Sequence, residues 1–243
     1  AVKLDGIKCL LMQDQNAAFS AYESGDALMI KDIPTQEITT LQKRPDYHID
    51  PQLGTYFIDL NNTLDEFKDA KVRQALSLAL DRKYISETIT AGTYTPAKGF
   101  IPQGVSDWDG SSWYDHLTDP SVYINVDDYQ ANLAKAKELL AEAGHPNGEG
   151  LPTLTYSTND SAYHKKIAEY LQQAWGELGL KVDVNIVEWK SFTPQRRSGN
   201  YQIARDGWVM DYDDPSNILN LTATGNGNNS SKYSNPEYDA LLE

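Results

Sequence analysis

The sequence predicts an α/β fold built on a partly parallel sheet. Helical and strand patterns alternate along the 243 residues, an order that places strands and their connecting helices in one sheet. The clearest unit is a strand at 151–157, a helix at 160–178 and a strand at 180–188. Such a β-α-β unit favours parallel, right-handed pairing. A chain of this length can form one large domain or two modest ones.

The first fifty residues predict short elements. Residues 2–12 and 27–30 are apolar runs typical of strands. A helix opened by Asp14 or Asn16 lies between them, because a short polar side chain caps free N–H groups at a helix start. Pro34 is placed to begin a second helix.

The middle of the chain has stronger patterns. Aromatic and β-branched residues predict a strand at 55–62. The segment "DAKVRQALSLALDR" predicts a helix whose apolar residues recur at helical spacing, namely Val72, Ala75, Leu76, Ala79 and Leu80. Asp81 is suited to cap a further helix through Ile89. Residues 93–122 show no periodicity and predict a long loop.

The second half continues this alternation. A helix beginning at Asp127 or Asp128 ends at Ala143–Gly144, since glycine is the commonest residue just after a helix. The segment "YQIARDGWVM" (201–210) predicts a strand, and "PEYDALLE" at the end predicts the start of a helix. The segment "RDGWVMDYDDPSN" (205–217) overlaps the end of this strand and sets one tryptophan among an arginine and several aspartates, which is unusual for a core strand.

Composition excludes several classes of function. A net charge of −14 disfavours nucleic acid and anionic membranes as partners. Cys9 is the only cysteine, so an intrachain disulfide is impossible; its apolar run predicts a buried, inert thiol. No phosphate-binding glycine motif or paired zinc histidines occur, and no apolar run has the length of a membrane helix. The sequence therefore predicts no metal, no cofactor and no enzyme.

Several segments together resemble a known family. They include "YFIDLNN", "FKDAKVRQALSLALDR", "AKELLAEAG", "STNDSAYHKKIAEYLQQAWGELGLKVDV", "GNYQIARDGWVMDYDDPSNILN" and "YSNPEYDALL". In this order they resemble the family-5 extracellular solute-binding proteins of ABC importers, and within them the oligopeptide-binding type.

The resemblance implies a type II periplasmic-binding-protein-like fold, a Venus flytrap with two α/β lobes closing over a ligand. We expect residues 1–53 to belong to the end of the first lobe, leading into the hinge. Residues 54–243 are expected to form most of the C-terminal inserted lobe, truncated at its end. The rest of the first lobe, with any signal and lipid-bearing cysteine, is expected to lie outside this fragment.

A peptide ligand offers an ammonium group, a repeating main chain and a carboxylate. Gly207 and Val209 are suited to present main-chain groups to a peptide that adds as a strand. In the family, the aspartate of "G-W-x-x-D-Y" pairs with the ligand ammonium, and Asp211 occupies that position. The alternative for Asp211 is one more surface acid in an acidic loop.

Further ligand-binding residues are implied by the same resemblance. Arg205, Arg196 and His164 match cationic positions that meet the ligand carboxylate, with surface ion pairs as the alternative role. Trp189 and Trp208 match aromatic walls of the pocket, with core packing as the alternative. Two departures concern a cysteine pair, replaced here by Gly54 and Val209, and a lysine, replaced by Thr90. They leave the preferred peptide length open.

The expected function is capture of short peptides for a membrane permease of an ABC importer, by a monomer outside the cytoplasm, in the periplasm or lipid-anchored at the cell surface. An alternative is the same fold carrying another solute, such as an oligosaccharide, a metal chelate or haem. A more distant alternative is a sensory or adhesion module.

Overall fold

The computed structural model describes residues 3–117 and 123–243 and divides the chain into two compact units, Ala1–Asp50 and Pro51–Glu243. Each unit is described by itself. The second unit contains every strand of the described chain and all the predicted ligand-binding residues.

The first unit contains two helices, α1 (Gln15–Glu23) and α2 (Ile38–Leu41). The Asp14 carboxylate accepts the N–H of Ala17, which confirms the predicted cap of α1. Four predictions are wrong here. Neither residues 3–12 nor residues 27–30 form a strand, α2 begins at Ile38 rather than near Pro34, and Cys9 is exposed. A strand requires a neighbour for its main-chain groups, and residues 3–50 supply none. Residue 2 of the predicted strand lies outside the described residues.

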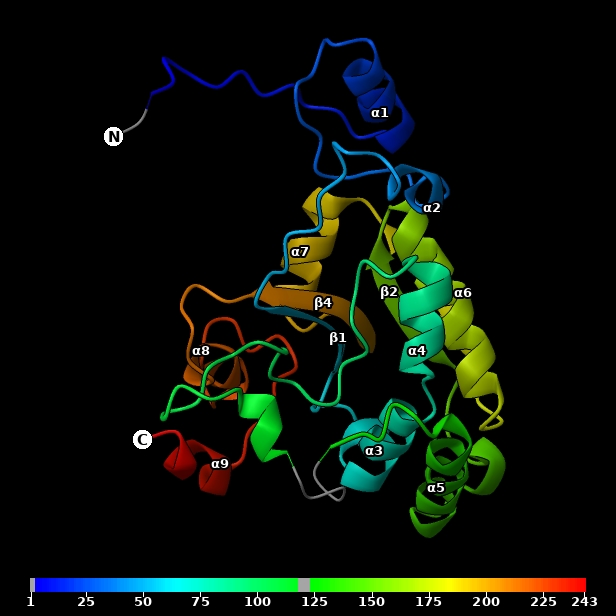
Figure 1. Cartoon of the computed structure of the whole chain (residues 1–243). Coiled ribbons are helices and arrows are strands. Elements are labelled where there is room, and N and C mark those ends of the chain that lie inside the picture. Colours follow the sequence, from blue (N-terminus) through cyan, green and yellow to red (C-terminus); the bar gives the residue numbers. More distant parts are fainter. Residues whose placement is uncertain (1–2, 118–122) are drawn as a thin grey trace. The chain divides into compact units, whose positions relative to one another are not determined.

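The second unit is organised around a four-stranded mixed sheet (Figure 1). The strands are β1 (Gly54–Leu60), β2 (Leu154–Asn159), β3 (Val182–Val187) and β4 (Ile203–Val209), in the order β1-β4-β2-β3. β1 is antiparallel to β4, whereas β2 is parallel to both β3 and β4. This arrangement confirms the predicted β-α-β unit and the partly parallel sheet.

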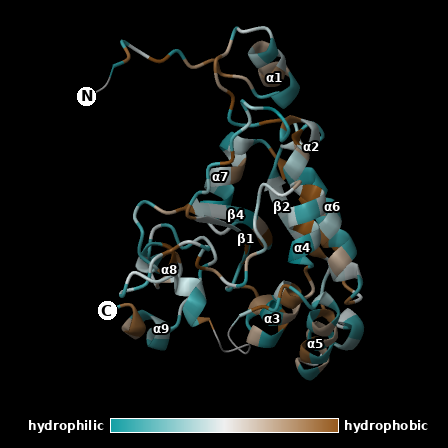
Figure 2. Ribbon diagram, in the orientation of Figure 1, coloured by the Kyte–Doolittle hydropathy of each residue, from teal (hydrophilic) through white to brown (hydrophobic). Residues whose placement is uncertain are grey.

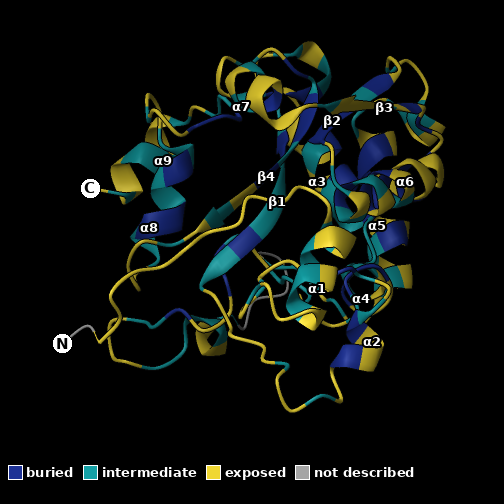
Figure 3. Cartoon of the chain, turned by 90° about the horizontal axis from the view of Figure 1, so that it is seen from above, coloured by how far each residue is buried: buried dark blue, intermediate teal, exposed yellow. Residues whose placement is uncertain are grey.

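One face of the sheet is covered by the helices that the apolar periodicity predicts. They are α3 (Ala70–Leu78), α4 (Arg82–Tyr84) with its π-helical extension Ile85–Ile89, α5 (Tyr129–Glu142) and α6 (Ala162–Gly176). The main core lies between these helices and the sheet and includes Phe67, Leu76, Leu140, Tyr156, Leu171 and Trp175, all almost fully buried. Figure 2 shows apolar and polar residues mixed on these helices, and Figure 3 shows buried residues on the strands.

Aspartate caps begin three of these helices, and the sequence predicts two of them, Asp81 and Asp128. The carboxylates of Asp69, Asp81 and Asp128 accept main-chain N–H groups at the starts of α3, α4 and α5. Such caps satisfy donors that have no partner inside the helix. The predicted loop after α4 is irregular through residue 117 except for a 3-10 turn at Trp113–His116 and an isolated bridge between Ser106 and Ser112. Its residues 118–122 lie outside the described part.

Two shorter helices, α7 (Trp189–Arg197) and α8 (Ser216–Leu219), pack on the opposite face of the sheet. Two small apolar clusters lie on this face: Phe192, Tyr201 and Ala204 form one, and Ile101, Val105, Ile218 and Leu221 form the other. α9 (Pro236–Leu241) lies beside α8, where the Tyr238 hydroxyl donates to Leu219 O (2.7 Å). The 3-10 turns are Asp65–Phe67, which joins the main core, Pro146–Gly148 after α5, and Asn220–Thr222 after α8. The sequence pattern does not predict α7, because the apolar residues of this helix are few and Pro194 lies inside it.

Candidate functional site

The last part of β4 has a free edge. β1 pairs with β4 along its whole length, from Ile203 to Val209. β2 pairs with the other edge only at Ile203 and Ala204. Beyond Ala204, no strand of the described chain pairs with that second edge. The free main-chain groups of such an edge can accept another strand.

The register shows which groups this edge presents. At one end of the ladder Met210 N–H donates to Leu53 O (2.7 Å), and at the other Asn61 N–H donates to Gln202 O (3.0 Å). Hydrogen-bonded partners alternate along an antiparallel pair, so β1 takes the even-numbered residues of β4. The main-chain groups of Arg205, Gly207 and Val209 therefore point to the free edge.

Asp211 lies two residues beyond the end of β4, and its side chain is exposed. No hydrogen bond or ion pair joins its carboxylate to another described residue. Its main chain is fixed by the buried Asn217, whose Oδ1 accepts the N–H of Asp211 (3.4 Å) and the indole N–H of Trp208 (2.8 Å). Trp208 also packs on the second small apolar cluster. The turn is thus held in place while the carboxylate stays unpaired.

The guanidinium of Arg205 is held among aromatic rings. Its centre lies 5.3 Å from the ring of Trp189 and 5.9 Å from those of Tyr56 and Phe192. Its Nε donates to Asn159 Oδ1 (2.8 Å). These contacts orient the group through cation–π attraction and one hydrogen bond. No acceptor among the described residues is bonded to its two terminal nitrogens, which remain available to a carboxylate.

Trp189 begins α7, and 52% of its surface is exposed. It packs against Phe192 with ring centroids 6.2 Å apart. One part of the ring supports Arg205 and the rest faces solvent, so Trp189 combines packing with an accessible aromatic wall.

Arg196 and Asp206 are joined to each other. Arg196 Nη1 lies 2.6 Å from Asp206 Oδ1, and each side chain is only 11% exposed. The same nitrogen donates to Arg205 O (3.1 Å). The positive charge of Arg196 therefore already has a partner within the chain.

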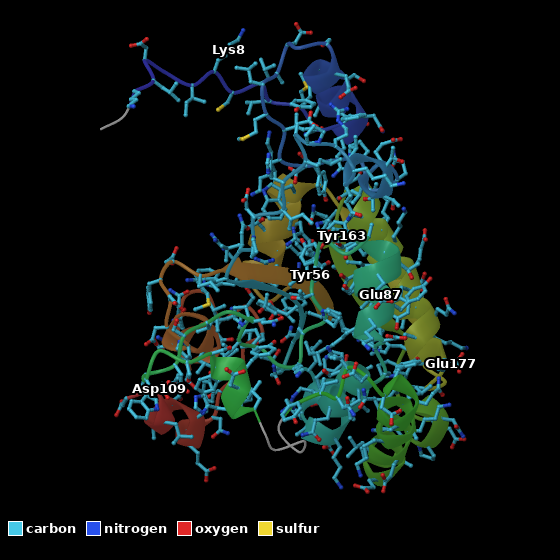
Figure 4. All side chains as sticks on the ribbon, viewed as in Figure 1. Lys8, Tyr56, Glu87, Asp109, Tyr163 and Glu177 are labelled. Carbon is cyan, nitrogen blue, oxygen red and sulfur yellow. The ribbon has the colours of Figure 1, made fainter. Side chains whose placement is uncertain are left out.

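His164 is buried on the opposite side of β1 from Arg196. Its Nδ1 lies 3.3 Å from the hydroxyl of Tyr56, and its ring contacts those of Tyr56 and Tyr163; both tyrosines are labelled in Figure 4. Burial, together with the nearby charge of Arg205, lowers the pKa of His164 to about 3. The imidazole is neutral at pH 7, so it can share a hydrogen bond but carries no charge of its own.

Other features give no competing site. One pocket of about 290 Å³ lies between the loop after α5 and the loop after α6, and another of about 360 Å³ lies among Asp81, Tyr84, Tyr129 and Tyr170. Neither is lined by a residue of β4 or by Asp211. Among the described residues, no group of three or more His, Cys, Asp or Glu side chains is placed to hold a metal ion.

Several residues of the site carry no signal in the sequence. Asn159 ends β2, Phe192 lies in α7, and Asn217 lies in α8. They meet Arg205, Trp208 and Asp211 only because the sheet and the turn after β4 bring these elements together. No local motif predicts their roles.

Comparison with known proteins gives the family. Residues 1–230 match the family model described as bacterial extracellular solute-binding proteins, family 5, middle region. The chain belongs to this family. This match confirms the resemblance seen in the sequence, and solved relatives confirm the type II periplasmic-binding-protein fold. Family-5 proteins are the binding components of transporters and not enzymes.

Individual relatives support the same assignment. The periplasmic oligopeptide-binding protein OppA of Escherichia coli is 34% identical over 91% of this chain and 40% of its own length. An oligopeptide-binding protein of Borrelia burgdorferi is 32% identical, with a TM-score of 0.79 over 95% of this chain and 44% of that one. Haemophilus influenzae OppA, solved with the peptide RPPGFSPFR, is 28% identical with the same TM-score, over 95% and 44%.

This family-5 chain thus spans less than half the length of these relatives. None of its described helices combines the length and apolarity that crossing a membrane requires. The comparisons leave the individual ligand-binding residues and the lobe boundary at residue 53 as predictions.

Proposed function

We propose that this chain is part of a receptor that captures short peptides by their main chain and termini and delivers them to the permease of an ABC importer. The observation that carries the proposal is the free edge of β4, with Arg205 on the strand and the unpaired Asp211 just beyond its end. Peptide-bound relatives of the same fold support it.

The free edge of β4 can bind peptides regardless of their amino-acid sequence. A peptide lying beside β4 as an added strand gains main-chain hydrogen bonds that do not depend on its side chains. The carbonyl of Gly207 and the N–H and carbonyl of Val209 are such groups, and both residues are exposed. The N–H of Gly207 donates instead to the Asp206 carboxylate (2.7 Å). Receptors of this kind accept many sequences of suitable length.

Charges at the two ends of the site fix the peptide termini. The ligand ammonium pairs with Asp211, and two unit charges 4 Å apart gain about 4 kcal/mol at an effective dielectric constant near 20. The Arg205 fork is suited to bind a carboxylate through two parallel hydrogen bonds. Trp189 forms a wall beside it, while Trp208 and Asn217 hold the turn that carries Asp211.

Closure of two lobes completes the receptor. One lobe leaves a ligand open to water, where ion pairs are worth little, so the 243 residues alone bind peptide weakly. The full receptor closes around its hinge, acts as a monomer and works outside the cytoplasm, in the periplasm or lipid-anchored to the outer face of the membrane.

Calorimetric titration of the full-length receptor with tri- to pentapeptides tests the proposal. Each peptide is compared with its N-acetylated form, which lacks the ammonium group but keeps the main chain. We expect heat of binding with free peptides and a large loss of affinity on acetylation. The absence of binding by every free peptide would refute the proposal and favour another solute, such as an oligosaccharide, a metal chelate or haem. Failure to co-purify with permease subunits would favour a sensory or adhesion role.

A further inference from the structure

A buried charged cluster lies behind the free edge of β4. Arg196 of α7 and Asp206 of β4 form its ion pair at 2.6 Å. Asp59 of β1, only 6% exposed, lies on the same face of the sheet, because it is opposite Ala204 and two positions from the partner of Asp206. The cluster therefore contains two carboxyl groups and one guanidinium.

Burial favours the neutral form of Asp59 in this cluster. Burial raises the pKa of Asp59 to about 8, and the charge of Asp206 and a hydrogen bond with it add to the shift. A neutral Asp59 thus lies beside the ion pair of Arg196 and Asp206. Two further groups face the cluster: Lys232 donates to Arg197 O (2.9 Å), and the Tyr201 hydroxyl donates to Ser230 O (2.7 Å).

The ion pair is also hydrogen-bonded to the main chain of β4 at its free edge. Arg196 donates to Arg205 O (3.1 Å), and the Asp206 carboxylate accepts the N–H of Gly207 (2.7 Å). Both of these main-chain groups belong to residues that point to the free edge. Withdrawing Arg196 toward a ligand would break its bond to the strand and leave Asp206 buried, ionised and without its cation, which is unfavourable.

We infer that Asp206 determines ligand specificity by holding Arg196 in this ion pair and so withholding it from the carboxylate of the peptide. The inference rests on the proposed function and deepens it. Arg205, whose terminal nitrogens have no bonded acceptor among the described residues, then meets the ligand carboxylate. Peptides whose carboxylate falls at Arg205 are favoured over peptides whose carboxylate would fall at Arg196.

The effect is measured as the ratio of affinities for a free-acid peptide and its C-terminal amide, over a series of peptide lengths. Amidation removes the ligand charge and little else, so a high ratio reports a cation at that position. The full-length receptor is compared with Arg196→Gln, Asp206→Ala, Asp206→Asn and the double variant Asp206→Ala/Arg196→Gln. Asp183→Asn, an exposed carboxylate of β3, is the control.

In a receptor that keeps Asp206, Arg196→Gln should leave the acid-to-amide ratio unchanged at every length, whatever it does to affinity in general. Asp206→Ala and Asp206→Asn should raise the ratio at a new length by about tenfold or more, the effect expected for one charge-assisted hydrogen bond. The double variant should lose that gain, because the freed cation is gone. Asp206→Asn keeps the shape of the side chain, so it serves if the alanine variant does not fold.

Selective loss of free-acid binding in Arg196→Gln would overturn the inference, as would an unchanged length profile in a folded Asp206 variant. Either result leaves peptide capture itself intact. Failure of every peptide to bind the unmodified receptor would instead overturn the proposed function and this inference together.

Discussion

The two ends of β4 differ in what surrounds them. Ile203 and Ala204 at its start are fully buried, with β1 on one side and β2 on the other. Gly207 and Val209 at its end have β1 on one side only and are exposed. One strand thus stabilises the fold at its first residues and leaves main-chain groups for a ligand at its last, because β2 pairs with two residues and then diverges.

The same contrast separates two aspartates on this segment. Asp206 is buried and bonded to a guanidinium and to a main-chain N–H. Asp211 is exposed, with no bonded partner for its carboxylate among the described residues. A carboxylate satisfied inside the fold serves structure, whereas an unpaired one held by a fixed turn is available to an ammonium group.

The largest expected effect is on ligand binding at the end of β4 that β2 leaves unpaired. Asp211→Asn in the full-length receptor should weaken peptide binding more than about 10²-fold, since removing one partner of an enclosed ion pair costs roughly 3–5 kcal/mol. Calorimetric titration measures this loss. Asp214→Asn, a nearby exposed acid, is the control and should bind normally. Equal affinities of Asp211→Asn and the unmodified receptor would contradict the proposed ammonium contact.

The next expected effect is on the free energy of unfolding, which should differ between substitutions at the two ends of β4. Ile203→Ala should lower the free energy of unfolding by about 2–5 kcal/mol, because it leaves a cavity in the main core. Val209→Ala, at an exposed position, should change it by less than about 0.5 kcal/mol. Urea unfolding of the 243-residue chain measures both. Similar losses at the two positions would show that the ends are equally important for the fold.

A proline pair tests the predicted direction of the main-chain groups. Val209→Pro removes an N–H from the free edge and should reduce peptide affinity by about 1–3 kcal/mol, since a ligand carbonyl loses its donor. It should spare the β1–β4 ladder. Met210→Pro removes the N–H that donates to Leu53 O and should reduce stability. Titration and urea unfolding of both variants check this; destabilisation by Val209→Pro alone would reverse the assigned register.

A further expected effect is a pH dependence of stability that arises from the buried charged cluster. Folding raises the pKa of Asp59 from 3.8 to about 8, so the folded chain holds this proton more tightly than the unfolded chain. The resulting stabilisation is complete below about pH 4 and is lost as pH rises through 8, by at most ~1.4 kcal/mol per pH unit.

Asp59→Asn checks this, since an amide stays neutral at every pH. Urea unfolding from pH 5 to pH 9 should show a steeper loss of stability in the unmodified chain than in the variant. Parallel curves would mean that Asp59 is not protonated in the fold.

The sequence predicted elements well where local chemistry was sufficient. Elements are identified without any distant partner by the apolar stripe of α3, the caps Asp81 and Asp128, and the alternation in β3. The sequence did not predict correctly the segments whose structure depends on a partner elsewhere in the fold. Residues 3–12 have strand-like composition but no strand beside them in the described part of their unit, and α7 is a helix without a strong apolar stripe.

For the site, the sequence by itself determined the fold class, the family and the motif that contains Asp211, because these depend on residue types at short spacing. The tertiary structure alone decided which partner each charge has. It joined Arg196 to Asp206, placed Arg205 among rings from β1 and α7, and left the end of β4 unpaired. Ion pairing and burial depend on distances between elements far apart in the chain, and these distances are set only when the sheet forms.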